Sequence, residues 1–313
     1  MHRRSLLLTA PRQLEWIVED LPPLQPGEVL VETHAGAIST GAELPQYCGT
    51  GSQNQKAHYP RMTGYESVGI VITSSSDVQN LHEGERVVAF YGHRTHSIVP
   101  ENKAIPVPDG ISDMLALLAI LTCDVSKGIR KLMPTENEPA LVTGAGAIGL
   151  LTVFMLKALG VNTVDIIEPD EKRRALARRL GARSALTPSE ASQSSHLYPI
   201  GIECSSRDQA FETLQAAMQQ NGRICIISDG NIEPLVLSPH FHEKELHIIG
   251  SSDGWNYQEH ARWYFSSLRE HPQQAHLLET LFEYTTTANE LADTFEELAQ
   301  GAISPVKVFV RYR

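Results

Sequence analysis

The sequence predicts an α/β protein with two domains, a compact β-barrel-like domain followed by a doubly wound parallel sheet. The chain of 313 residues is longer than a typical single domain. Its first hundred residues form short β-rich runs that are separated by Gly, Pro, Asn and Asp. From Pro139 onward, apolar strands alternate with amphipathic helices. Such alternation is typical of a parallel sheet that is covered by helices on both faces.

The β-rich part begins with a strand at Leu6–Ala10, which Pro11 ends. Further β-rich runs follow, and irregular loops with turn residues join them. These runs lie at 27–39, 66–75, 84–90 and 96–108.

The character of the sequence changes near Ser112. Apolar residues recur at helical spacing over 112–132, and Ser112 can cap the first turn of this helix. The tail, 254–313, has the pattern of two or three helices and a last strand at 305–312. The alternating part is predicted as strand 140–146, helix 147–160, strand 163–169, helix 170–181, strand 200–206, helix 207–222 and strands 223–230 and 245–252.

Charge and composition bear on the kind of partner, and we expect a small-molecule substrate, neither nucleic acid nor a membrane. A formal net charge of −11 argues against nucleic acid or an anionic membrane surface as a partner. The basic run Lys172–Arg179 has the spacing of a solvated helix face. No stretch of about 18 apolar residues is present, so we expect no membrane span. The four cysteines are scattered without a CxxC pair, which favours a reducing cytoplasm.

A glycine motif follows the first strand of the alternating part. Its glycines stand in GxGxxG spacing, after an apolar strand and at the start of a helix. This context indicates a Rossmann dinucleotide-binding turn, in which the glycines allow a tight turn and a close approach of the backbone to a diphosphate. The helix N-terminus then offers free N–H groups and a positive dipole end. The predicted cofactor-binding residues here are Gly144, Ala145, Gly146, Ala147, Ile148 and Gly149.

An acidic residue, Glu168, ends the next predicted strand, 24 residues after Gly144. A carboxylate in this place accepts hydrogen bonds from the adenosine ribose and repels a 2′-phosphate. The sequence therefore favours NAD over NADP as the cofactor. Lys172 and Arg173 lie nearby and could partly accommodate the extra negative charge of a 2′-phosphate, which weighs against this preference. Arg173 is a further predicted cofactor contact.

At this point the chain resembles the medium-chain dehydrogenase/reductase family along nearly its full length. The segments GEVLVETHAGAISTGAEL, YPRMTGYESVGIV and HEGERVVAF look like family segments. The nearest subset lacks the zinc loop and includes bacteriochlorophyllide a dehydrogenase-like and sugar or polyol dehydrogenase-like proteins. The resemblance implies a chaperonin-10-like catalytic domain at 1–120 and 254–313, a Rossmann domain at 121–253 and a homodimer. It also implies cofactor contacts at Cys204, Ser205, Ser228, Gly250 and Ser251.

The positions that bind catalytic zinc in related enzymes carry other residue types here. Thr40 stands at the cysteine position, Tyr65 at the histidine position, and the third position falls near Ala119. None of these is a good zinc ligand, because zinc takes thiolate, imidazole or carboxylate groups. The relay hydroxyl position carries Ala42, and the four-cysteine structural lobe is missing. We therefore expect no metal.

Without zinc, other groups must stabilise the reacting oxygen and exchange its proton. Thr40 and Tyr65 occupy the ligand positions, so their hydroxyls are candidates for hydrogen bonds to this oxygen. Glu66 is a candidate base or orienting group, and a structural carboxylate paired with a cation is the alternative. His93 is a candidate proton relay.

The predicted activity is a zinc-independent, NAD(H)-dependent interconversion of a secondary alcohol and a ketone. A sugar, a polyol or a biosynthetic intermediate would suit as substrate, and the subset suggests a hydroxyethyl tetrapyrrole as one variant. Two alternatives stay open: an NAD(P)H-dependent quinone or enoyl reductase, and a catalytically silent NAD-binding sensor or scaffold. The sequence decides neither the substrate nor the direction of the reaction.

Overall fold

The computed structural model describes residues 1–50, 58–228, 233–252 and 257–312. The chain divides into two compact units. The first unit comprises Met1–Ile120, Tyr257–Ala261 and Glu279–Arg313, and the second comprises Leu121–Asn256 and Arg262–Leu278. Residues 262–278, which the sequence assigned to the catalytic domain, therefore lie with the second unit.

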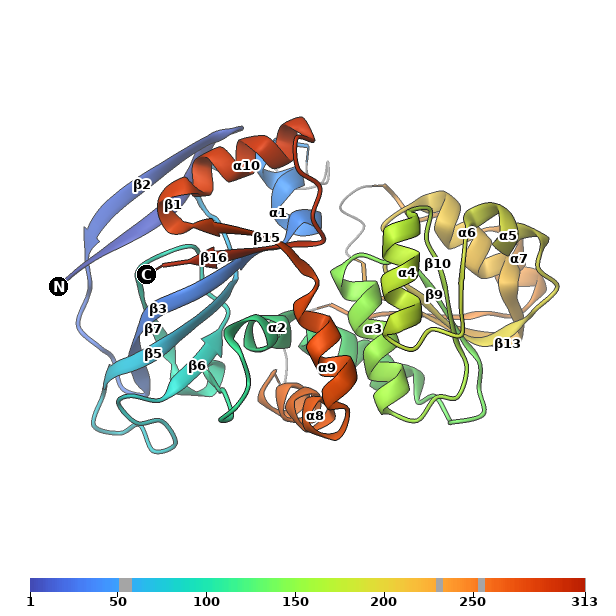
Figure 1. Cartoon of the computed structure of the whole chain (residues 1–313), viewed down its shortest axis with the longest axis horizontal. Helices are drawn as coiled ribbons and strands as arrows, with labels where there is room; N and C mark the ends of the chain where they lie inside the picture. Colours follow the sequence, from blue (N-terminus) through green and yellow to red (C-terminus); the bar gives the residue numbers. More distant parts are fainter. Residues whose placement is uncertain (51–57, 229–232, 253–256, 313) are drawn as a thin grey trace. The chain divides into compact units, whose positions relative to one another are not determined.

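The first unit is built mainly of antiparallel strands (Figure 1). One sheet has the strand order β2-β1-β4, and a larger sheet has the order β15-β16-β3-β5-β6-β8, with β7 also paired to β3. The parallel pair β15–β16 is the exception to the antiparallel pattern. The strands are β1 (His2–Ala10), β2 (Gln13–Asp20), β3 (Glu28–Ile38), β4 (Arg61–Met62), β5 (Glu66–Ser74), β6 (Arg86–Ala89), β7 (His96–Pro100), β8 (Ile105–Pro106), β15 (Phe282–Thr287) and β16 (Lys307–Arg311), with helices α1 (Thr40–Tyr47) and α10 (Leu291–Gln300) and short 3₁₀ turns η1 (Glu101–Lys103) and η2 (Ala288–Glu290).

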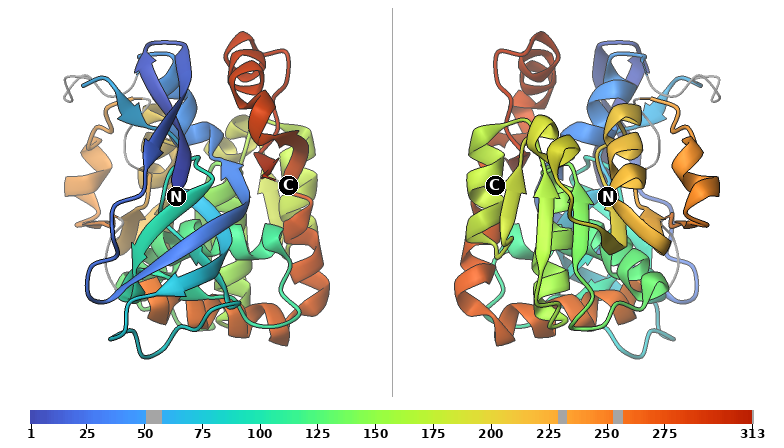
Figure 2. Two further views of the ribbon diagram at one scale, coloured as in Figure 1. Left: turned by 90° about the vertical axis from the view of Figure 1, so that its left-hand side faces the viewer. Right: turned by 90° about the vertical axis from the view of Figure 1, so that its right-hand side faces the viewer.

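The second unit contains a six-stranded parallel sheet with the order β11-β10-β9-β12-β13-β14. The right-hand view of Figure 2 shows these strands side by side between helices. The strands are β9 (Ala140–Thr143), β10 (Val164–Ile167), β11 (Ser184–Leu186), β12 (Tyr198–Glu203), β13 (Met218–Ile226) and β14 (His247–Gly250). The helices are α3 (Ala147–Ala158), α4 (Glu171–Arg179), α5 (Pro188–Gln193), α6 (Asp208–Ala217) and α7 (Pro239–Glu243); α2 (Asp113–Leu132), α8 (Tyr257–Glu270) and α9 (Pro272–Glu279) cross the division between the units.

The predicted fold class is confirmed by this topology. The chain leaves β9 toward β10 on one side and returns to β12 on the other, so β9 marks the point where the strand order reverses. In open α/β sheets, ligands bind outside the carboxyl ends of the strands at such a point. Helices α3 and α4 pack against each other and against β10.

Two predictions about the elements need correction. The helix predicted at 207–222 ends at Ala217, because Met218 is fully buried and pairs with Tyr198 in the parallel sheet. Pairing in the sheet thus outweighs the helical pattern of the sequence. The tail holds an additional strand, β15, which was not predicted. Ser112 caps α2 as expected, since its hydroxyl oxygen accepts a hydrogen bond from the N–H of Leu115 at 3.3 Å.

No helix in the described part of the chain is both long enough and apolar enough to cross a membrane.

Candidate active site

The glycine-rich turn connects β9 to α3 and leaves its backbone accessible. The N–H of Gly144 donates to the carbonyl of Ile167 at 2.8 Å, which ties the turn to β10. A Cβ atom at Gly149 would lie 1.8 Å from the carbonyl oxygen of Gly144, so no side chain fits there. A Cβ at Gly146, in contrast, would meet no heavy atom of the described chain within 4 Å. The turn therefore offers open space beside its backbone, as a diphosphate requires.

Helix α3 presents its N-terminus at the same place. Gly146 is the N-cap residue and supplies no side chain to the first turn, so no side-chain cap satisfies the N–H groups there. The helix dipole adds a partial positive charge at Ala147 and Ile148. These residues fit an anionic group in the position that the sequence predicts.

Glu168 follows β10 and is 5% exposed. One carboxylate oxygen accepts from the N–H of Ala145 at 2.6 Å, and the other accepts from the N–H of Asp170 at 2.9 Å. The carboxylate is therefore held directly against the glycine-rich turn. Each oxygen keeps lone-pair capacity for a further donor, so the group fits a ribose hydroxyl.

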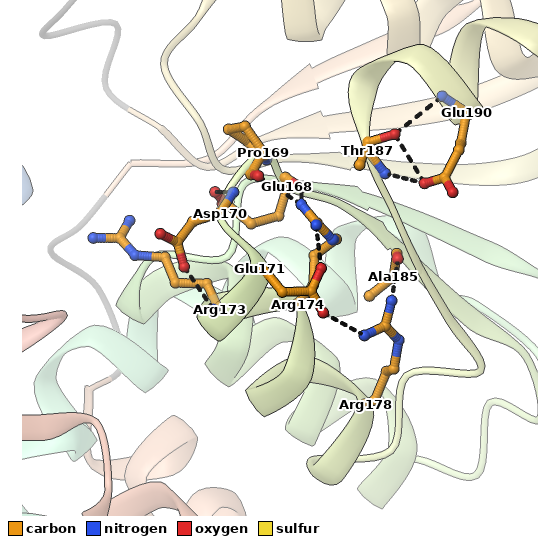
Figure 3. A network of polar contacts seen from close by, with 10 residues as sticks. All are labelled: Glu168, Pro169, Asp170, Glu171, Arg173, Arg174, Arg178, Ala185, Thr187 and Glu190. Carbon is orange, nitrogen blue, oxygen red and sulfur yellow. Dashed lines mark hydrogen bonds and ion pairs between the residues drawn. The ribbon is translucent and has the colours of Figure 1, made fainter.

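The loop that carries Glu168 is fixed by Arg174 (Figure 3). This guanidinium donates to the carbonyls of Glu168 at 2.8 Å and Pro169 at 2.6 Å, and it pairs with Glu171. Arg174 is 8% exposed, so the prediction of a solvated basic face over Lys172–Arg179 is wrong at this residue. The carbonyl of the buried residue Glu168 needs a donor, and Arg174 supplies it.

Arg173 lies on the neighbouring turn of α4. Its N–H donates to Asp170 at 2.9 Å, which caps the helix. Figure 3 shows its guanidinium directed away from Glu168. Within the residues that the structure describes, this guanidinium contacts no hydrogen-bonding partner, so it is available to a ligand but not positioned by the protein.

Glu203 is a buried carboxylate at the end of β12 that the sequence analysis did not select. It accepts from the N–H groups of Ser205 at 2.6 Å and Ser206 at 3.0 Å. It also accepts from the hydroxyls of Ser205 and Ser228, so it links the ends of β12 and β13. An acidic residue directly after a buried apolar strand and before Cys204 was the signal that could have identified it.

The remaining predicted cofactor residues lie at or just after the carboxyl ends of strands β9, β12, β13 and β14. The N–H of Cys204 donates to the carbonyl of Thr143 at 3.1 Å. A Cβ at Gly144 would lie 2.9 Å from the Cα of Ser205, so these two segments touch. Ser251 donates its N–H to Ile226 at 3.0 Å, next to the end of β13. Lys131 of α2 donates to the carbonyl of Gly250 at 2.6 Å.

In the first unit, Thr40 and Tyr65 do not form a metal site. The hydroxyl of Thr40, at the start of α1, donates to the carbonyl of Val306 at 3.3 Å. The ring of Tyr65 stacks on Phe90 with a centroid distance of 5.4 Å. Across the described ranges, no group of three or more His, Cys, Asp or Glu residues could hold a metal ion. The donor set at these positions consists of neutral hydroxyls, which do not fit catalytic zinc.

Glu66 opens β5 and pairs with Lys307 of β16. The Nζ of Lys307 lies 2.7 Å from Oε1 of Glu66, and both side chains are fully buried. Burial raises the pKa of Glu66, and the charge of Lys307 opposes this effect. A paired, buried carboxylate is the structural alternative that the sequence left open for this residue.

His93 is buried between two polar groups. Its Nε2 lies 3.3 Å from Oε2 of Glu43, and its Nδ1 lies 3.4 Å from the hydroxyl of Tyr312. Glu43 also accepts from the N–H groups of Ser39 and Gly64, each at 2.8 Å. The structure thus connects His93 to the segment that begins at Thr40, through a carboxylate that sequence reasoning missed.

Comparison with known proteins agrees with this description. Residues 25–109 match the family model for the alcohol dehydrogenase GroES-like domain, and residues 147–264 match the model for zinc-binding dehydrogenases. L-threonine 3-dehydrogenase of Vibrio cholerae is 25% identical over 268 residues, which cover 72% of this chain and 77% of the relative.

Solved structures share the fold along the whole chain. A short chain alcohol dehydrogenase (rspB) of Escherichia coli CFT073, complexed with NADH, has a TM-score of 0.82 at 22% identity and covers 99% of both chains. A protein of Sinorhizobium meliloti 1021 bound to NADP has a TM-score of 0.83 at 18% identity and covers 100% of both chains. With both matched regions in the same order as the two folded units, the chain belongs to the medium-chain dehydrogenase/reductase family and is an oxidoreductase of the alcohol dehydrogenase type.

Proposed function

We propose that the protein is a zinc-independent, NAD(H)-dependent oxidoreductase that interconverts a secondary alcohol and a ketone. The observation that carries this proposal is the donor set at the positions of the zinc ligands. Thr40 is engaged through its hydroxyl with a backbone carbonyl, and Tyr65 stacks on an aromatic ring. Hydroxyl groups at these positions support hydrogen bonding to the reacting oxygen in place of metal coordination.

The cofactor preference rests on Glu168. Its carboxylate is held by two backbone N–H groups, and within the described residues it forms no ion pair, since Arg174 donates to the backbone carbonyl of Glu168 instead. A 2′-phosphate there would meet a fixed negative charge. The related structures contain NADH in one case and NADP in the other, so the family accommodates both. Glu168 favours NAD in this chain.

The nicotinamide, when bound, supplies the acceptor or donor of hydride. The chain's own residues must bind the substrate and stabilise the oxygen as its proton leaves. Tyr65 would donate a hydrogen bond to this oxygen, and Thr40 could do so only by releasing its hydrogen bond to the carbonyl of Val306. One relative is named L-threonine 3-dehydrogenase, and the name describes oxidation of a secondary alcohol. A sugar, a polyol or a biosynthetic intermediate, including a hydroxyethyl tetrapyrrole, is the substrate class that we propose.

We further propose a homodimer. Strand β14 is the last in the order of the parallel sheet, and its outer edge pairs with no other strand of the described chain. A second copy could extend the sheet there by two-fold symmetry. Size measurement in solution tests this directly, since a monomer would contradict it.

Turnover of ketones and enones with NADH and NADPH separates the candidate functions. We expect ketone reduction with NADH, and we expect Tyr65→Phe to reduce kcat about 10²-fold. Enone reduction with NADPH alone would instead indicate a quinone or enoyl reductase. If the protein binds the cofactor but neither oxidises nor reduces it with any of a broad panel of ketones, alcohols and enones, it is a catalytically silent NAD-binding sensor or scaffold.

A further inference from the structure

Two buried carboxylates, Glu168 and Glu203, lie on either side of the strand that leads into the glycine-rich turn. Thr143, the last residue of β9, pairs with Ile167 of β10 on one side and with Glu203 of β12 on the other. Glu168 follows Ile167 directly. Neighbouring strands of a sheet lie about 4.8 Å apart, so the ends of β10 and β12 are about 10 Å apart, with the end of β9 between them. The turn after β9 is therefore flanked by one carboxylate on each side.

Glu203 is fully buried, and its two oxygens have different partners. Oε1 accepts from the N–H groups of Ser205 and Ser206 and from the hydroxyl of Ser205. Oε2 accepts from the hydroxyl of Ser228, two residues after the end of β13. Ser206 has a φ of 57°, in the left-handed region that is unfavourable for a residue with a side chain. The carboxylate therefore stabilises a turn after β12 that carries backbone strain.

The turn after β12 packs directly against the glycine-rich turn. A Cβ at Gly144 would lie 2.9 Å from the Cα of Ser205, and a Cβ at Gly149 would lie 3.7 Å from the Cβ of Cys204. The N–H of Cys204 also donates to the carbonyl of Thr143 at the end of β9. Glu203 thus fixes a segment that borders the backbone to which a diphosphate would bind.

The carboxylate also sets the direction of two hydroxyl hydrogen bonds. A carboxylate accepts and does not donate, so the hydroxyl protons of Ser205 and Ser228 point at Glu203. The oxygen of Ser205 accepts in turn from the N–H of Arg207 at 3.2 Å. The side chain of Ser228 is half-buried, and no residue in the described part of the chain donates to its oxygen. Ser228 therefore presents lone pairs, and not a proton, to a ligand at this end of the sheet.

The carboxyl end of the sheet thus separates two kinds of hydrogen-bonding group. At Gly146 and Ala147 the start of α3 offers N–H donors, which fit the oxygens of a diphosphate. On one side Glu168 offers an acceptor, and on the other side Ser228 offers a second one. A dinucleotide has the matching order of groups, because it carries one ribose on each side of its diphosphate and ribose hydroxyls can donate.

We propose that Ser228 accepts a hydrogen bond from a hydroxyl of the nicotinamide ribose, and that Glu203 is the positioning residue that fixes the direction of this bond. The inference rests on the proposed NAD(H)-dependent function and adds a contact on the nicotinamide side of the cofactor. With the diphosphate at the turn and the adenosine ribose at Glu168, the second ribose extends toward β12 and β13. There the ribose donates to Ser228, and Ser228 donates to Glu203.

The first experiment measures the affinity of three ligands by calorimetry. NADH and ADP-ribose both contain the second ribose, and ADP lacks it. Ser228→Ala should weaken the binding of NADH and ADP-ribose about fivefold, the value of one hydrogen bond, and leave that of ADP within about twofold. A loss for NADH without a loss for ADP-ribose overturns the ribose contact, because the donor would then lie on the nicotinamide.

Glu203→Gln tests the direction of the hydrogen bond while it keeps the shape of the side chain. The amide oxygen can accept from the three donors at Oε1, so the amide NH₂ then faces Ser228 and donates to its oxygen. The lone pair is thereby occupied and the hydroxyl proton turns outward. We expect the same selective loss for NADH and ADP-ribose as in Ser228→Ala. A role confined to holding the turn would weaken all three ligands equally, and that result overturns the inference.

A double variant shows whether Glu203 acts through Ser228. In a chain that already carries Ser228→Ala, Glu203→Gln should change the affinity for NADH by less than about twofold. Glu233→Gln is the matched control, since Glu233 binds the guanidinium of Arg207 and the N–H of Asp208 at the start of α6. It should leave the affinities for all three ligands within about twofold of the wild type. Thermal unfolding of each variant confirms that it is folded.

Turnover of ketones and alcohols separates this inference from the proposed function. If the wild type turns over no substrate but Ser228→Ala shows the selective loss, the ribose contact is supported and the proposed function is overturned. If the enzyme is active and Ser228→Ala binds NADH as tightly as the wild type, the inference is overturned and the proposed function stands.

Discussion

The ammonium nitrogen of Lys307 lies 2.7 Å from a carboxylate oxygen of Glu66, and neither side chain has any exposed surface. The two residues are 241 positions apart in the chain. Their contact ties the last strand of the first unit to the segment that begins at the zinc-ligand position Tyr65. A buried ion pair is costly to form and is costly to break from one side only.

Lys307→Met should therefore destabilise the protein by about 3–5 kcal/mol, because Glu66 is left as an unpaired buried charge. The double variant Glu66→Met/Lys307→Met should recover most of this loss, because it removes both charges and fills similar volume. Urea unfolding of the two variants and the wild type measures the difference. If the double variant were as unstable as Lys307→Met alone, packing rather than charge would be the cause.

Two glycines of the cofactor turn should respond differently to alanine. Gly149→Ala drives a methyl group into the carbonyl of Gly144, so we expect a loss of stability of about 1–3 kcal/mol. Gly146→Ala has open space, so its free energy of unfolding should change by less than about 0.5 kcal/mol. Its affinity for NADH should nevertheless fall at least about tenfold, because the methyl group occupies the approach of the diphosphate. Thermal unfolding and NADH fluorescence titration measure the two effects, and unchanged affinity in folded Gly146→Ala would place the cofactor elsewhere.

Replacement of Glu168 tests the preference for NAD. Glu168→Ser removes the charge that opposes a 2′-phosphate, so the ratio of kcat/KM for NADH to that for NADPH should fall at least about tenfold, or about 1.4 kcal/mol. Glu190→Gln is the matched control, since it removes the charge of an exposed carboxylate that bonds to Thr187 of the same half of the sheet and leaves Arg174 in place. A wild type that prefers NADPH would contradict the assignment.

The pH dependence of stability should show the raised pKa of Glu66. Burial raises this pKa above the unfolded value of about 4.3. The contribution of the protonated carboxyl to the free energy of unfolding is therefore complete below about pH 4.3. It is lost as the pH rises through the pKa that Glu66 has in the folded protein. Unfolding free energies from pH 4 to 9 should decline more steeply in Lys307→Met, which retains Glu66, than in Glu66→Gln/Lys307→Met. Parallel curves would show that Glu66 has an ordinary pKa.

Local patterns in the sequence were sufficient for much of the fold. The apolar strand, the glycine spacing and the following helix predicted β9, the turn and α3, because each depends on neighbouring residues. The helix predicted at 207–222 was too long, since pairing of Met218 with Tyr198 depends on a partner that is distant in the chain. Strand β15 was missed for the same reason, as it is defined by pairing with β16.

The site shows the same limit. Gly144, Gly149 and Glu168 were identified by spacing, and the structure brings them together around one turn. The position of Glu203 at the end of an apolar strand was a usable signal, but its contacts with Ser205 and Ser228, and the pairing of Lys307 with Glu66, arise only in the folded chain. The sequence showed which zinc ligands are replaced, but not that Glu66 pairs with Lys307 and that His93 lies beside Glu43 in the interior of the first unit.

The central claim is that this fold performs alcohol and ketone chemistry without zinc, and turnover by metal-free protein tests it most directly. Purified protein is treated with a chelator, its zinc content is measured by elemental analysis, and NADH-dependent ketone reduction is followed in the same sample. We expect less than about one zinc ion per ten chains, with kcat unchanged from the untreated protein. Stoichiometric zinc in the untreated protein, with activity that the chelator abolishes and added zinc restores, would contradict the account.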